Sequence, residues 1–232
     1  MRDSKDAQSA DGTIQPQCGS AVVDYHNGHL AVVIGGRETP TVKKAQNRAY
    51  QTHMPVGSSI KPIAVYAPAL DKGASPATIL YNVPARIPGW GTDKGYPSNY
   101  GGGGFSGPTT MRVGLRKSLN VVAAATLMQY VGVEDSYNYL VSMGVKSTIN
   151  KDGPGLALGT SGITPIEMAG CFGTLANLGE YVEPVSFTRI EDNEGNLVLD
   201  VTETQVRRQV FKQTTSWMIT DLLEDAVQNG TG

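Results

Sequence analysis

The sequence is poor in charge and has no long apolar stretch. Only 17% of its 232 residues are charged, against about 25% in an average globular protein, and the formal net charge is −2. No segment concentrates lysine and arginine, so binding to nucleic acid is not supported. No apolar run approaches the roughly 18 residues of a membrane span, and the polar N-terminus lacks the apolar segment of a signal peptide.

Cysteine is also scarce. Cys18 and Cys171 lie far apart and form no metal-ligand spacing, so we expect two buried free thiols and neither a metal nor another cofactor. A disulfide between them is the less favoured alternative. The first residues are polar, and no linker or repeat divides the rest. We therefore expect a lead-in over residues 1–16 and one domain over residues 17–232.

Turn signals predict two hairpins. The runs Gly19–Asp24 and Leu30–Ile34 flank Asn27-Gly28, a strong hairpin signal, and are apolar almost throughout. We expect this first hairpin to be covered on both faces. Residues 186–191 and 196–201 flank Asn193-Glu194-Gly195 and predict a second hairpin. Residues 37–57 have no periodicity and are predicted to be a loop.

Apolar periodicity and end signals predict the helices. They are expected over residues 58–70, 109–117, 121–130, 134–143, 164–178 and 214–227. Proline is tolerated only in the first turn of a helix, so Pro62 requires the first helix to begin near Ser58. Thr164, Pro165 and Glu167 form a capping box with proline at the first helical position. Residues 74–108, rich in Pro, Gly, Asn and Tyr, predict a long surface loop of the kind that often forms a binding wall.

A serine and a lysine at the start of the first helix could form a nucleophile and its base. Ser58 would lie among free backbone N–H groups, and Lys61 follows three residues later on the same face. A serine hydroxyl attacks well only if a base takes its proton, and lysine serves as that base only when its pKa is lowered. The spacing alone is weak, because a chain of this length contains about one such match by accident. An N-capping Ser58 with a surface Lys61 remains the alternative.

A second polar pair interrupts the helical segments. Ser118 and Asn120 lie two residues apart at the predicted break, so both side chains could face one cleft. Helix capping by Ser118 is the alternative. The similar Ser136-Tyr137-Asn138 falls within a predicted helix and shows how readily this pattern arises.

Taken together, several blocks resemble the transpeptidase domain of penicillin-binding proteins, which is similar to the serine β-lactamases. The blocks are Val22-Val23-Asp24, Asn47-Arg48-Ala49, Gly57-Ser58-Ser59-Ile60-Lys61-Pro62, Lys117-Ser118-Leu119-Asn120, Leu158-Gly159-Thr160-Ser161 and Thr164-Pro165-Ile166-Glu167-Met168-Ala169. They cover nearly the whole chain in order. Residues 47–49 and 158–169 resemble the class A (bifunctional) members most.

The resemblance implies a fold and an activity. The fold would be α/β of the α+β type, with a helical subdomain and an incomplete antiparallel sheet. Ser58 would be acylated by the D-Ala-D-Ala bond of a peptidoglycan stem peptide, or by a β-lactam. Lys61 would accept its proton, Ser118 would relay a proton to the leaving group, and Asn120 would bind substrate and place Lys61. The backbone N–H of Ser58 would be one oxyanion donor.

Two features depart from the family pattern. Val56 stands where the family most often has proline, and the third motif, Lys-(Thr/Ser)-Gly, is missing. Lys151-Asp152-Gly153 lies too early in the chain to replace it. We expect a piece cut just before that motif, without the final sheet strands and closing helix, and therefore weak or inactive by itself.

These features leave more than one hypothesis. The first is part of a class A peptidoglycan synthase at the extracytoplasmic face of the membrane, held there only by segments outside this chain. The alternative is a non-catalytic penicillin-binding-like module that recognises cell-wall peptides or acts as a scaffold. A β-lactamase is less favoured, because the sequence shows no obvious positioned deacylating base.

Overall fold

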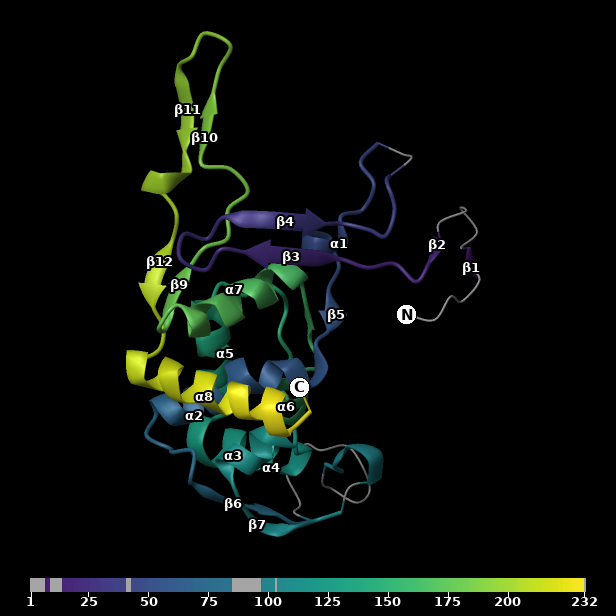
Figure 1. Cartoon of the computed structure of the whole chain (residues 1–232), viewed down its shortest axis with the longest axis vertical. Helices are drawn as coiled ribbons and strands as arrows, with labels where there is room; N and C mark the ends of the chain where they lie inside the picture. The colour runs from purple at the N-terminus through teal and green to yellow at the C-terminus, as the bar shows by residue number, and fades with distance from the viewer. Residues whose placement is uncertain (1–6, 9–13, 41–42, 85–96, 103, 232) are drawn as a thin grey trace.

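The protein is described by a computed structural model that covers residues 7–8, 14–40, 43–84, 97–102 and 104–231 (Figure 1). A helical body carries short antiparallel two-stranded ladders at its edges, which confirms the expected mixture of helices and antiparallel strands. In these ranges no helix is both long and apolar enough to cross a membrane. Of the predicted polar lead-in, residues 7–8 and 14–16 are described and contain the ladder of β1 (Ala7–Gln8) with β2 (Ile14–Gln15).

An irregular helical rod runs through the centre of the body. It begins as the 3-10 turn η1 (Gly57–Ile60), continues as the wide π-type turn η2 (Pro62–Tyr66) and ends as α2 (Ala67–Asp71). Every residue from 61 to 70 is buried. Pro68 has no N–H to donate to Ala64, and the Ala64 oxygen instead accepts a 2.6 Å hydrogen bond from Ser136 Oγ. The predicted helix start near Ser58 is confirmed.

The remaining helices surround this rod. They are α3 (Met111–Arg116), α4 (Asn120–Thr126) with its π-type extension η4 (Leu127–Val131), α5 (Val133–Ser142), α6 (Pro154–Leu158), α7 (Pro165–Ala176) and α8 (Gln213–Asn229). Each of α3 to α8 contacts η2. Ile63, Met111, Leu140 and Ile219 are among the fully buried core side chains. The mid-helix position expected for Ser136 is confirmed, because it lies within α5.

The first predicted hairpin is present, but its expected coverage on both faces is wrong. It consists of β3 (Ser20–Val23) and β4 (Leu30–Ile34), with α7 packed against β3. Val22 is 50% exposed, and Val32, Val33 and Ile34 are also exposed. A run of β-branched residues signals a strand without specifying what packs on its second face. Gly28 adopts φ +78° at the turn, where a Cβ would lie 2.4 Å from the Glu183 oxygen.

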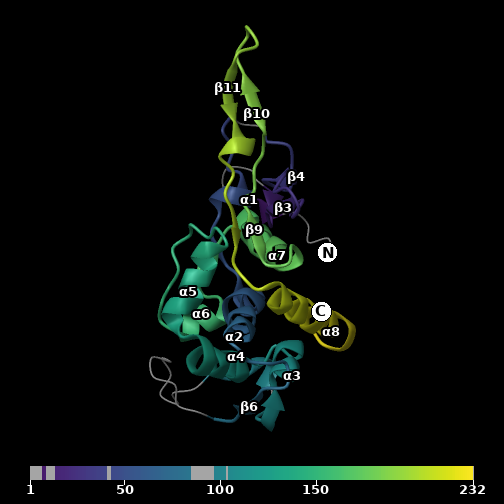
Figure 2. The ribbon, with the colours of Figure 1, turned by 90° about the vertical axis from the view of Figure 1, so that its left-hand side faces the viewer.

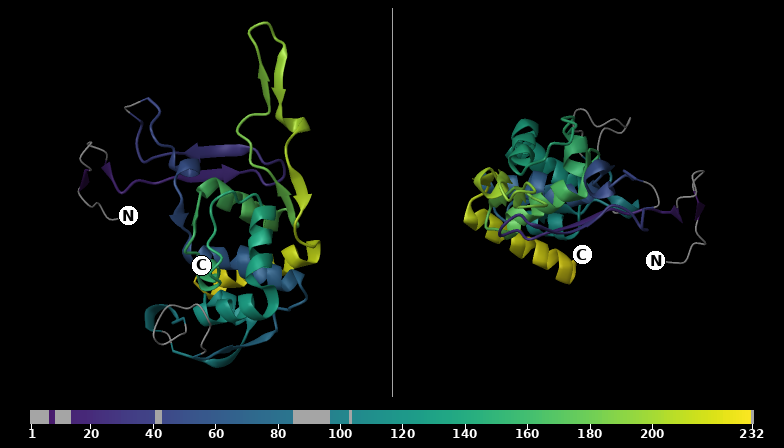
Figure 3. Two further views of the ribbon diagram at one scale, coloured as in Figure 1. Left: turned by 180° about the vertical axis from the view of Figure 1, so that it is seen from behind. Right: turned by 90° about the horizontal axis from the view of Figure 1, so that it is seen from above.

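The second predicted hairpin projects from the body. β10 (Arg189–Glu191) pairs with β11 (Leu197–Asp200), followed by the short turn η5 (Val201–Glu203). The hairpin extends away from the helices in the rotated view of Figure 2 and from behind in Figure 3. At its base, β9 (Glu180–Val182) pairs with β12 (Arg207–Gln209).

Three other expectations need correction. Residues 37–57 are not all loop, since they contain α1 (Arg48–Gln51) and β5 (Met54–Pro55), which pairs with β8 (Gly162–Ile163). The 74–108 segment contains β6 (Ile79–Asn82), η3 (Tyr100–Gly102) and the start of β7 (Gly107–Thr110), while residues 85–96 and 103 lie outside the described ranges. Cys171 is a buried free thiol as predicted, whereas Cys18 is exposed.

Candidate active site

Lys61 lies at the centre of the candidate site. Its side chain is buried, in a residue only 1% exposed. The Nζ donates to the Ser118 backbone oxygen at 2.8 Å, to Ser118 Oγ at 3.1 Å and to Asn120 Oδ1 at 2.7 Å. The structure thus brings together three of the four predicted site residues, and the alternative of a surface Lys61 is wrong.

This environment prepares Lys61 to exchange a proton. Desolvation by burial lowers the pKa of Lys61 from 10.5 to about 8. The Ser118 carbonyl and Asn120 Oδ1 can only accept hydrogen bonds, so they hold both N–H groups of a neutral Lys61 amine. Its lone pair is then left for a hydroxyl proton. Lys61 can therefore act as a base near neutral pH.

Ser118 has an unusual backbone conformation that places its carbonyl against Lys61. Its φ is +50°, in the left-handed region that glycine favours. It ends α3 in a Schellman motif, in which Leu119 N–H donates to the Gly114 oxygen at 2.9 Å and Ser118 N–H donates to the Leu115 oxygen at 2.8 Å. Glycine would occupy this position without strain, so the presence of serine raises the hypothesis that its hydroxyl has a function.

Replacing Ser118 by glycine tests whether the hydroxyl supports activity at the expense of backbone strain. Glycine relieves the left-handed strain, so we expect Ser118→Gly to raise the free energy of unfolding by about 0.5–1 kcal/mol. The same change removes the Oγ beside Lys61 and is expected to slow acylation by a β-lactam at least tenfold. Urea denaturation and stopped-flow acylation measure the two effects. Ser118→Ala is the control, because it removes the hydroxyl and keeps the strain; gain of activity in Ser118→Gly would contradict the assignment.

Asn120 begins α4 and is held at both ends of its amide. Its Oδ1 accepts from Lys61, and its Nδ2 donates to the Ser98 backbone oxygen at 2.8 Å. The Ser98 oxygen can only accept, so the amide orientation is determined by its partners. The contact with Ser98 is not predicted by any local pattern, since 22 residues separate Ser98 from Asn120.

Ser58 lies in the first turn of η1 and is exposed, three residues before the buried Lys61. Among the described residues its hydroxyl has no hydrogen-bond partner, so the structure does not join it to Lys61 directly. Catalytic hydrogen bonds are often long or absent without substrate. The first N–H groups of a helix have no intrahelical acceptor, which leaves Ser58 N–H suited to bind a developing oxyanion.

The turn that carries Ser58 is clamped by a distant glycine. Gly57 N–H donates to the Gly159 oxygen at 3.0 Å, and β5 pairs with β8 beside it. Gly159 has φ +73°, and a Cβ there would lie 2.1 Å from the Gly57 oxygen. Any larger residue would therefore displace the turn that carries Ser58. Gly159 is predicted only as part of the resemblance, and its own signal is a glycine directly after the apolar residues 156–158.

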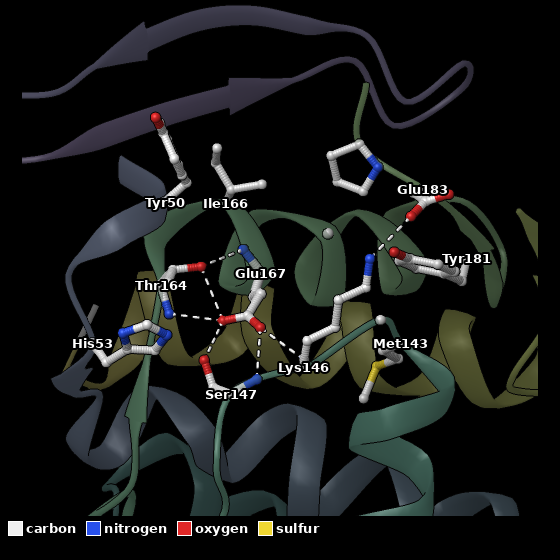
Figure 4. Close-up of a pocket in the computed structure, with 13 residues that line it drawn as sticks. Tyr50, His53, Met143, Lys146, Ser147, Thr164, Ile166, Glu167, Tyr181 and Glu183 are labelled. Atoms are coloured by element: carbon white, nitrogen blue, oxygen red, sulfur yellow. Dashed lines mark hydrogen bonds and ion pairs between the residues drawn. The ribbon is translucent and has the colours of Figure 1, made fainter. Parts of the chain in front are cut away.

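Glu167, in the first turn of α7, connects this helix to residues 146–147, which lie between α5 and α6. It completes the predicted capping box with Thr164 and also accepts hydrogen bonds from Lys146 N, Ser147 N and Ser147 Oγ (Figure 4). Partial burial alone would raise the pKa of Glu167, but the bonds from Ser147, Thr164 and Lys146 outweigh it and lower the pKa. The adjacent cavity of about 410 Å³ is lined by none of the four predicted site residues.

Lys61, Ser118 and Asn120 form one hydrogen-bonded group, which we call the Lys61 cluster. Together with the fold, this cluster defines a class of protein in which a lysine, one turn after an exposed serine, binds a Ser-x-Asn pair. A family model described as the penicillin binding protein transpeptidase domain matches residues 19–232. The chain therefore belongs to the penicillin-binding protein transpeptidase family.

Individual relatives agree with this assignment. The chain is 36% identical to penicillin-binding protein 1F of Bacillus subtilis over 95% of its length and 29% of the relative's. It is 37% identical to penicillin-binding protein 1A of Vibrio cholerae over 74% of its length and 20% of the relative's. The crystal structure of penicillin-binding protein 1A from Haemophilus influenzae superposes with a TM-score of 0.75 at 27% identity, covering 98% of this chain and 38% of that one. The predicted resemblance to class A proteins is confirmed, and the chain spans less than a third of the length of these curated relatives.

Proposed function

We propose that this chain carries the acylation machinery of a peptidoglycan D,D-transpeptidase. The observation that supports this most is the buried Lys61, whose pKa is lowered to about 8 beside Ser118 and Asn120. A buried amine of this kind, one turn after an exposed serine, is suited to activate that serine. Family membership narrows the chemistry to acyl transfer.

Acylation would begin with attack by Ser58 Oγ on the carbonyl carbon of a D-Ala-D-Ala bond. The neutral Lys61 amine takes the hydroxyl proton, and the Ser58 N–H stabilises the negative carbonyl oxygen. The tetrahedral intermediate then expels the terminal D-Ala. Ser118 passes a proton from Lys61 to the leaving nitrogen, which leaves an ester on Ser58 and a neutral Lys61.

Deacylation would reverse these roles. An amine of a neighbouring stem peptide attacks the ester, Lys61 receives its proton, and Ser58 leaves with a proton returned through the same cluster. The product is a cross-link between two peptides. Water in place of the amine gives the carboxypeptidase reaction.

The setting of this reaction is also a proposal. We place it at the extracytoplasmic face of the cytoplasmic membrane, with stem peptides as substrates and β-lactams as covalent inhibitors. One solved relative, PonA1 of Mycobacterium tuberculosis, is described in complex with penicillin V and shares this fold with a TM-score of 0.73 at 22% identity. The alternative is a non-catalytic module that recognises cell-wall peptides or acts as a scaffold, and it would be supported if the complete gene also lacked Lys-(Thr/Ser)-Gly.

Covalent labelling by a fluorescent penicillin separates these functions. The protein expressed from its complete gene is incubated with the reagent, and the labelled peptide is identified by mass spectrometry. We expect stoichiometric labelling of the peptide that contains Ser58. The 232-residue chain, tested in parallel, is expected to react slowly or not at all. A folded gene product that stays unlabelled at millimolar reagent favours the non-catalytic module.

A further inference from the structure

Two buried asparagines lie behind the candidate site. Asn82, at the end of β6, is 1% exposed, and Asn99 is 5% exposed. Asn99 Nδ2 donates to Asn82 Oδ1 at 2.9 Å and to the Gly104 oxygen at 3.3 Å, while Asn82 Nδ2 donates to Ser106 Oγ at 3.0 Å. Buried amides cost free energy unless they are hydrogen-bonded, so this cluster has one well-defined arrangement.

The remaining atom of the Asn99 amide reaches the first turn of α4. Asn99 Oδ1 accepts from Asn120 N at 2.9 Å and from Val121 N at 3.4 Å. The residue before this helix, Leu119, makes no side-chain capping bond. A helix start with no local cap leaves its first N–H groups unsatisfied. Asn99 therefore supplies from 21 residues away the cap that the local sequence lacks.

The same segment also holds the Asn120 side chain. Ser98 O accepts from Asn120 Nδ2, so residues 98 and 99 bind both the backbone and the amide of Asn120. Asn120 Oδ1 in turn accepts from Lys61 Nζ. A displacement of Asn99 would therefore move Asn120, and through Asn120 it would change the position of Lys61.

We infer that Asn99 is a positioning residue for Asn120 and Lys61. This inference rests on the proposed function of Lys61 as the base. Asn99 does not touch the reacting atoms. Its amide fixes where α4 begins, and the oxygen of the neighbouring Ser98 holds Asn120 Nδ2, so that Asn120 Oδ1 is turned toward Lys61. Asn82 fixes the orientation of Asn99, because an oxygen acceptor at Asn82 requires the Asn99 NH₂ on that side.

A double-mutant cycle tests this relation in the protein expressed from its complete gene. We expect Asn99→Ala to slow acylation by a β-lactam by about 10–100-fold, because misplacing the base loses only part of the roughly 10²–10⁴-fold that a positioned base contributes. If Asn99 acts through Asn120, adding Asn99→Ala to Asn120→Ala costs less than threefold more. Asn99→Asp retains an acceptor for Asn120 N–H but places a carboxylate oxygen against Asn82 Oδ1 and the Gly104 oxygen, so it is expected to recover only part of the loss. If the double variant is slowed by the product of the factors measured for the two single variants, the inference is overturned.

A matched control separates positioning from general loss of stability. Thr110 caps α3 by accepting from Val113 N at 3.3 Å and does not contact the Lys61 cluster. We expect Thr110→Ala and Asn99→Ala to lower the melting temperature similarly, by roughly 2–4 °C, with acylation slowed only by Asn99→Ala. Equal slowing by both would overturn a specific role.

Amide exchange provides a reading that does not depend on the proposed activity. We expect Asn99→Ala to speed hydrogen exchange at the N–H groups of Asn120 and Val121 and to leave that of Val113 unchanged. If the wild-type protein proves inert to β-lactams while exchange at Asn120 rises as expected, the proposed function fails and the capping by Asn99 stands. Unchanged exchange at Asn120 would remove the structural basis of the inference.

Discussion

Replacing Ser58 by alanine is expected to abolish covalent labelling by penicillin, and replacing Ser59 is not. The two serines are adjacent and both exposed. Ser59 Oγ already donates to the Val56 oxygen at 2.6 Å, whereas Ser58 Oγ has no partner among the described residues. The free hydroxyl is the one available for attack. We expect at least a 10³-fold loss in Ser58→Ala, and less than a fivefold loss in Ser59→Ala, measured by acylation in the protein from its complete gene.

This pair controls for folding within one turn of η1. Both variants remove one exposed hydroxyl, so their thermal unfolding midpoints should lie within about 2 °C of each other. Retained labelling in a folded Ser58→Ala protein would contradict the nucleophile assignment. Loss of labelling in both variants would show that labelling depends on the conformation of the η1 turn and not on the Ser58 hydroxyl alone.

Local signals in the sequence predicted where the central helix and α7 begin. Pro62 located the start of the central helix, because proline is excluded from later turns. The Thr164–Glu167 capping box located α7 and is present with both of its hydrogen bonds. Such signals act over three or four residues, which a reading of the chain can detect.

The contacts between segments could not be obtained in this way. Lys61 and Ser118 are 57 residues apart, and only the resemblance placed them together. The capping of α4 by Asn99 and the clamp of Gly57 by Gly159 were missed, because neither is encoded by a local pattern. The exposed second face of β3–β4 was missed for a related reason: apolar strand residues indicate a preference for burial and do not specify a partner.

Replacing Lys61 by methionine is expected to slow acylation by about 10³-fold at pH 8 and to remove most of its pH dependence. Burial lowers the pKa of Lys61 to about 8, so the neutral amine that takes the Ser58 proton increases as pH rises toward this value. In the wild-type protein the rate should therefore rise from pH 6 and level off above about 8. Lys61→Arg, which keeps the charge and cannot lose a proton, should be equally slow and without this rise.

The same pKa has a consequence for stability that requires no substrate. Between about pH 8 and the ordinary lysine value of 10.5, the folded state binds fewer protons at Lys61 than the unfolded state does. The free energy of unfolding therefore gains a positive slope with pH in that window, and Lys61→Met removes this contribution. Urea denaturation at pH 7.5 and 9.5 measures the difference between the two proteins. An identical pH dependence in both would mean that Lys61 titrates as an ordinary surface lysine, and it could then not be the base that activates Ser58.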